Sequence, residues 1–153
     1  MRPPASLPMQ ILINPGQITI LFEEFNDFRI IHIDQKTHPE DPDPSFFGHQ
    51  IGHWEGDTLV VDSVGFTDET VIDSVGMPHS DAMHIVEWIR RTGPGTLEDV
   101  MTITDPKAFT RPWTTVSSYR RVAGVAIQEY HCENDRNVPD AHGATGVQMP
   151  AGR

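Results

Sequence analysis

HQIGHWEGDTLVVDSVGF, residues 49–66, decides the fold class of this chain. Two runs rich in β-branched and aromatic residues, 49–55 and 58–66, flank the dipeptide Gly56-Asp57. Such runs favour strands, and a Gly-Asp pair between them favours a tight turn. The stretch therefore predicts a β-hairpin, and the rest of the chain repeats the same pattern.

Strand-forming runs separated by turn signals continue in both directions from this hairpin. Residues 82–91 could also form a short helix, but their β-branched and aromatic content favours a strand. Two stretches are predicted as loops: 35–48, which carries three prolines, and 67–81, which is expected to pass over the mouth of a barrel. The predicted strands cover residues 10–13, 17–25, 28–34, 49–55, 58–66, 82–91, 96–104, 113–122 and 126–133.

Eight or nine short strands joined mostly by tight turns predict an all-β protein. They suit an antiparallel up-and-down barrel, because closure removes the exposed edges of a sheet. An eight-stranded barrel either fills its interior with side chains or holds one small ligand. A β-sandwich built from the same strands is the alternative. With 153 residues the chain is expected to form a single domain, with irregular tails at 1–8 and 138–153.

The composition narrows the classes of partner. The formal net charge is −11, which disfavours nucleic acid and anionic membranes because both require clustered Lys and Arg. A small-molecule ligand or substrate is the expected partner, and a homodimer is possible. The single cysteine, Cys132, allows no intrachain disulfide. No signal peptide and no apolar stretch of membrane-spanning length is seen, so a cytoplasmic location is expected.

Four stretches are distinctive: HWEGDTLVVDSVGF (53–66), PHSDAMHIVEWIRR (78–91), TITDPKAFTRPWT (102–114) and EYHCEND (129–135). Together they carry a resemblance to a known family. The chain resembles, over roughly residues 9–137, a family of uncharacterised bacterial proteins whose members are often exported and carry an extra N-terminal segment. The family has no assigned activity, so the resemblance implies a shared fold. The strand pattern is also similar to that of the calycin, or lipocalin-like, barrels by analogy.

Two positions depart from that family's pattern. The positions that match Asp99 and His131 are usually aliphatic or apolar in the family, and both are polar here. The comparison suggests an interior adapted for chemistry or for a polar ligand.

Strand alternation predicts which side chains meet inside the barrel. Asp99 shares a face with Leu97, Met101 and Ile103, and Glu87 shares one with Ile85. A carboxylate in an apolar interior is costly unless paired, and burial raises its pKa towards neutrality. We therefore expect an acid/base set suited to proton transfer. In the competing interpretation, one or both of Glu87 and Asp99 point to solvent, or the two sit as a satisfied pair. One register slip would reverse every assignment of a side chain to a face.

The predicted site has two parts. The candidate catalytic residues are Glu87, Asp99, His131, Tyr119 and His84. The candidate substrate-binding residues are Phe22, His32, Trp54, Trp88, Trp113 and Met101.

A metal site and cofactors are not expected. His79, Asp81 and His84 could supply three ligands if the chain bends there. His79, Ser80 and Asp81 are more simply explained as residues that tie down the loop entering the next strand. The chain has no G-x-G-x-x-G, P-loop, C-x-x-C or G-x-S-x-G motif, which argues against nucleotide cofactors and nucleophilic hydrolysis.

Three functions fit these patterns. The leading hypothesis is a cofactor-independent enzyme of isomerase, cyclase or lyase type, acting by acid–base catalysis on a small, largely apolar molecule. The alternative is a lipocalin-like binding protein without catalysis. A third is a structural domain whose barrel is filled by its own side chains.

Overall fold

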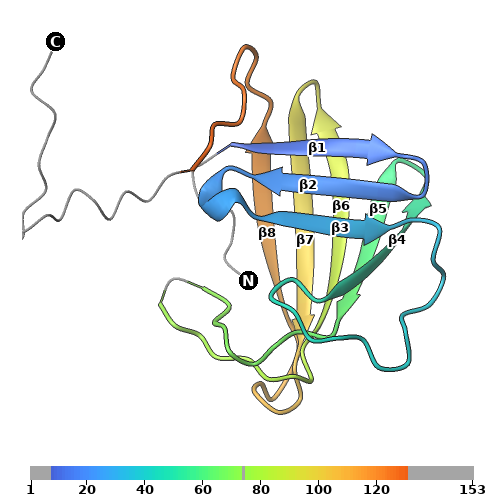
Figure 1. Ribbon diagram of the computed structural model, residues 1–153, viewed down its shortest axis with the longest axis vertical. Helices are drawn as coiled ribbons and strands as arrows, with labels where there is room; N and C mark the ends of the chain where they lie inside the picture. Colours follow the sequence, from blue (N-terminus) through green and yellow to red (C-terminus); the bar gives the residue numbers. More distant parts are fainter. Residues whose placement is uncertain (1–7, 74, 131–153) are drawn as a thin grey trace, which may run out of the picture.

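The computed structural model describes residues 8–73 and 75–130, which form one eight-stranded sheet and a short 3₁₀ helix (Figure 1). The predicted all-β fold is thus confirmed, and residues 82–91 contribute to a strand and not to a helix. The elements are β1 (Met9–Asn14), β2 (Gln17–Phe22), η1 (Glu24–Asn26), β3 (Phe28–His32), β4 (His49–Glu55), β5 (Thr58–Val64), β6 (His84–Gly93), β7 (Thr96–Thr104) and β8 (Trp113–Arg120).

Consecutive strands are neighbours throughout, in the order β1 to β8. The hairpin predicted over residues 49–66 forms, with Glu55 paired with Thr58 across the turn. The pairing of β3 with β4 is parallel, whereas the other pairings are antiparallel. Residues 33–48 supply the long connection that a parallel pairing requires, because the chain must return to the starting end of the sheet.

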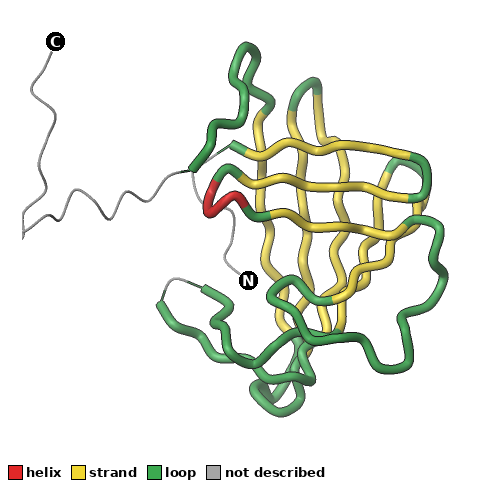
Figure 2. The backbone as a smooth tube through the Cα atoms, in the orientation of Figure 1, coloured by secondary structure: helices red, strands yellow, loops and turns green. Residues whose placement is uncertain are grey.

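The sheet curls strongly into a half-barrel. In Figures 1 and 2, β1–β3 run crosswise to β6–β8, with β4 and β5 leading from one group to the other. β1 and β8 are the two outer strands of the sheet. The side towards which the sheet curls is called the concave face below, and the opposite side the convex face.

Two apolar clusters fill the concave face. The first joins β2 and β3 to β5 and β6, and consists of Ile18, Ile20, Ile31, Leu59, Val61 and Ile89. The second lies under the loops that precede β6 and follow β7, and consists of Phe66, Ile72, Met83, Ile85 and Ile103. The predicted excursion over 67–81 therefore buries part of its own chain, since Ile72 is a core residue.

The last predicted strand is wrong over the part of it that the structure describes. Residues 126–130 are not in a strand, and 131–133 lie outside the described residues. The chain leaves β8 and reaches η1, where the side chain of Asn26 makes two 2.9 Å hydrogen bonds with the backbone of Tyr130. Side-chain alternation predicted a strand here, but the backbone of this segment bonds to polar side chains near η1.

Within residues 8–73 and 75–130, no helix has the length and apolar character needed to cross a membrane.

Candidate functional site

A band of polar side chains crosses the concave face between the two apolar clusters. It comprises Arg29 on β3, Gln50 on β4, Glu87 on β6 and Asp99 on β7, all of them buried. Buried charges are rare unless paired. The band is therefore a candidate functional site.

Arg29 and Glu87 form the centre of the band. The two terminal nitrogens of Arg29 donate to the two carboxylate oxygens of Glu87, at 2.9 and 2.5 Å. The Nε of Arg29 donates to Gln50 at 3.1 Å, and Gln50 in turn donates to the carbonyl of Phe47. Burial by itself would lower the pKa of Arg29, but the charge and hydrogen bonds of Glu87 raise it overall. This bidentate pairing holds the Glu87 side chain in one orientation.

Asp99 differs from Glu87 because, among the described residues, no arginine or lysine side chain donates hydrogen bonds to its carboxyl group. Burial, and then the charge of Glu87, raise the pKa of Asp99 from 3.8 to about 7. Its carboxyl lies within hydrogen-bonding reach of Glu87, so the protonated form donates to Glu87. Its other oxygen, Oδ1, is buried and has no hydrogen-bond partner among the described residues. Asp99 is 6% exposed and Glu87 is 0% exposed, so Asp99 is the less completely buried of the two residues.

Tyr119 on β8 completes this part of the site. Burial, and then the charge of Asp99, raise the pKa of Tyr119 to about 12. The phenol therefore stays protonated across the physiological range and can donate a hydrogen bond. Two other buried polar atoms of the concave face, Ser63 Oγ and Trp113 Nε1, have no partner among the described residues.

Sheet register explains why these residues meet. Glu87 pairs with Met101, so Asp99, two residues earlier on β7, is its diagonal neighbour on the same face. Leu97 pairs with Tyr119, which places Tyr119 diagonal to Asp99 in the same way. Glu87, Asp99 and Tyr119, three of the candidate catalytic residues, therefore lie on one face of the sheet.

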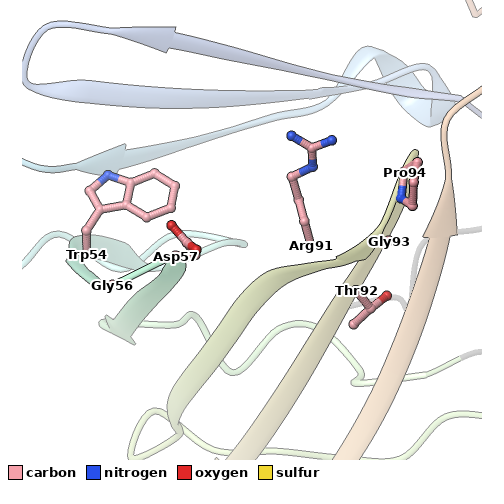
Figure 3. A pocket seen from close by; sticks show the side chains of 7 residues that line it. All are labelled: Trp54, Gly56, Asp57, Arg91, Thr92, Gly93 and Pro94. Carbon is pink, nitrogen blue, oxygen red and sulfur yellow. The ribbon is translucent and has the colours of Figure 1, made fainter.

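An open pocket of about 660 Å³ lies at one end of the concave face (Figure 3). This pocket, called the mouth pocket below, lies between the β4–β5 turn and the β6–β7 turn. Arg91 belongs to the row of residues next to that of Asp99, because Arg91 pairs with Leu97 and Ile89 with Asp99. The pocket is lined by Trp54, Gly56, Asp57, Arg91, Thr92, Gly93 and Pro94.

The other predicted pocket residues divide between the two faces. Phe22 packs against the first apolar cluster, and Met101 and Trp113 pack against the second. Trp54 lines the mouth pocket. Trp88 pairs with Val60 and is 36% exposed on the convex face, away from Glu87.

His84 and His32 also lie on the convex face, so the structure does not bring them together with Glu87 and Asp99. His84 and His38 each bond to Asp62 Oδ1, at 2.9 and 3.0 Å. His38 also contacts His49 through their Nδ1 atoms, 2.9 Å apart, and His32 stacks on His49. Burial, and then the neighbouring His38 and His32, lower the pKa of His49. His32 and His84 each lie one residue from a core residue, Ile31 and Ile85, on their strands, so their side chains point to the opposite, convex face.

The proposed loop role of His79, Ser80 and Asp81 is confirmed. Asp105, which is buried, accepts hydrogen bonds from the backbone and hydroxyl of Ser80 at 2.6 and 2.7 Å. His79 bonds to Thr70, and Asp81 pairs with Lys107. In the part of the chain that the structure describes, no group of three or more His, Cys, Asp or Glu residues is arranged to hold a metal ion. His131 lies outside the described residues.

The sequence prediction missed Arg29, Gln50 and Arg91. Arg29 shares a strand face with Ile31 and Ile33, so its place on a core face was visible in the pattern. Gln50 and Arg91 left no such signal, because their roles depend on which strands become neighbours.

Comparison with family models, with curated proteins and with solved structures gives no match. The function is therefore inferred from the side chains themselves.

Proposed function

We propose that this protein is a cofactor-independent enzyme that performs acid–base catalysis on a small, largely apolar molecule at the concave face. The observation that carries the proposal is Asp99: a buried carboxyl with a pKa of about 7, one oxygen unpartnered and a small exposed fraction. A group with a pKa near the working pH can both take and return a proton, which is the requirement for a general acid–base catalyst. Perturbed carboxyls of this kind cluster at active sites.

Glu87 and Tyr119, the neighbours of Asp99, have different roles in the proposed catalysis. Glu87, tied to Arg29, supplies a fixed negative charge that favours the protonated form of Asp99. Tyr119 is a neutral donor for an oxygen that becomes negative during the reaction. In an isomerisation, the Asp99 carboxylate takes a proton from a carbon next to a carbonyl, and the electron pair moves onto the carbonyl oxygen. The proton then returns to a different carbon, and no oxidant or cofactor is consumed.

The cleanest test uses nitrobenzisoxazole, whose ring opens when a base removes its one reactive C–H proton. The proton goes to the base, the C–H electron pair forms a nitrile, and the N–O bond breaks to release a coloured phenolate. We expect the protein to accelerate this reaction, with a rate that rises as the pH passes the Asp99 pKa of about 7. The Asp99→Asn variant should lose about 100-fold in rate or more.

Glu98→Gln is the matched control, because Glu98 adjoins Asp99 on the strand but pairs with Arg90 on the other face. It should keep the wild-type rate. A wild-type protein no faster than buffer, or an Asp99→Asn variant as fast as wild type, overturns the proposal.

A lipocalin-like binding protein is the second candidate. It is favoured by the curled, mostly antiparallel sheet and by the mouth pocket, which Trp54 lines (Figure 3). In that case an apolar fluorescent probe binds equally well to wild type and to Asp99→Asn, and neither protein opens nitrobenzisoxazole.

A further inference from the structure

We propose that the mouth pocket is a recognition site for a small aromatic zwitterion. Arg91 holds the carboxylate of the ligand, Asp57 holds its ammonium group, and the indole of Trp54 packs against its ring. The site is separate from the Asp99 carboxyl, and the proposal stands whether or not Asp99 performs chemistry.

The size and the aromatic wall of the pocket suit such a ligand. At about 660 Å³ the pocket falls within the range of small-molecule sites. Trp54 is 51% exposed although its cross-strand partner Leu59 belongs to the first apolar cluster. A large indole left half exposed beside a cavity is a surface on which an aromatic ring can stack.

Arg91 is set apart from its neighbour Arg90. Arg90 makes two hydrogen bonds to Glu98, at 3.0 and 2.8 Å. Among the described residues no acid pairs with Arg91, which faces the pocket (Figure 3). The register of β6 and β7 shifts between Arg91 and Gly93, and bulges of this kind re-aim side chains next to binding sites.

Asp57 provides the opposite charge on the other wall. It comes from the β4–β5 turn, beside Trp54, whereas Arg91 comes from β6 across the pocket (Figure 3). Asp57 and Arg91 line one pocket but form no ion pair with each other. A simple anion would gain from Arg91 and lose from Asp57 and from the net charge of −11. A zwitterion satisfies both groups.

The test uses three probes that share one ring: phenylalanine, hydrocinnamate, which lacks the ammonium group, and phenethylamine, which lacks the carboxylate. Binding is followed by the NMR shift of the Trp54 indole N–H. We expect phenylalanine to bind up to about fivefold more tightly than either of the others, because an exposed charge pair contributes up to about 1 kcal/mol.

The variants assign each contact. Arg91→Gln should reduce phenylalanine to the affinity of phenethylamine, and Asp57→Asn should reduce it to the affinity of hydrocinnamate. Trp54→Leu should weaken the binding of all three probes. For this variant binding is measured by calorimetry, because the Trp54 indole signal is lost. Arg90→Gln, the matched control, should change nothing.

Three results overturn the proposal: no probe binds, hydrocinnamate binds most tightly, or Arg91→Gln leaves the phenylalanine affinity unchanged. Asp99→Asn should bind phenylalanine like wild type. Loss of nitrobenzisoxazole turnover with intact phenylalanine binding, or the reverse, therefore separates this proposal from the proposed catalysis.

Discussion

Three ionisable side chains share one buried space at the centre of the concave face, and their charges do not balance if all are ionised. Arg29 contributes one positive charge, while Glu87 and Asp99 could contribute two negative charges. The fork from Arg29 goes to Glu87, so the excess charge falls on Asp99. Burial makes that charge costly, which is why Asp99 is the member of the trio that holds a proton near neutrality.

This protonation has a consequence for stability that the Asp99→Asn variant reveals. The folded protein holds a proton on Asp99 up to a pH of about 7, whereas the unfolded chain releases it near 3.8. Between these values the unfolded state binds fewer protons, so the contribution of Asp99 to stability falls as the pH rises. Asparagine cannot ionise, so the stability of the variant lacks this pH dependence. Between about pH 4 and about pH 8, we expect its free energy of unfolding to rise relative to that of wild type by roughly a few kcal/mol.

Urea unfolding of both proteins across this pH range measures the difference. Any pH-independent effect of the substitution cancels in the comparison. Parallel curves for the two proteins would show that Asp99 ionises in the folded state as it does in the unfolded chain.

At the scale of strands and turns, most elements could be predicted from the residues within and beside each strand. The hairpin over 49–66 was predictable because a turn dipeptide separates two strand-forming runs. The parallel contact between Ile31 and Gln50 was not, because it depends on how the 33–48 loop returns the chain. The strand expected over 126–133 failed for a similar reason, since Asn26 competes for the backbone of Tyr130.

The candidate site could likewise be predicted only in part from local sequence. Period-two alternation placed Asp99 on the face of Met101 and Glu87 on the face of Ile85, and the strand register joins these faces into one. Alternation cannot say which of two faces becomes concave, so His84 and Trp88 were grouped with a site that lies on the other side of β6.

Gly52 shows how one residue lets an element fit. It lies on β4 beside the parallel junction, and a Cβ placed there would come within 2.7 Å of Ile31 Cγ2. Ile31 is fully buried in the first apolar cluster and cannot move outward. We expect Gly52→Ala to lower the free energy of unfolding by about 1–3 kcal/mol through overpacking. Urea denaturation measures the loss.

Gly93→Ala is the matched control for that substitution. A Cβ at Gly93 would meet its nearest neighbour, Thr96 Oγ1, only at 3.9 Å. The change in stability should stay within about 0.5 kcal/mol. Equal effects at the two positions would mean that the contact with Ile31 does not limit the packing of β4.

At the scale of the whole molecule, two apolar clusters could unfold separately or as one body. The polar band lies between them, and the Arg29–Glu87 pair joins β3 to β6 across it. β6 contributes Ile89 to the first cluster and Ile85 to the second, so one strand passes through both. A strand shared in this way cannot leave one cluster without disturbing the other, which predicts a single cooperative transition.

Isoleucine methyl NMR during a urea titration tests this prediction, because each cluster has its own reporters. Ile18 reports on the first cluster and Ile85 on the second, and their signals should be lost at one shared midpoint. Ile20→Val, in the first cluster, and Ile103→Val, in the second, should each cost about 1 kcal/mol. In a cooperative protein each substitution lowers the midpoint of both reporters by the same amount, wherever the methylene was removed. If Ile20→Val moves the Ile18 midpoint and leaves that of Ile85 in place, the clusters are independent folding units, and the polar band is a boundary between them.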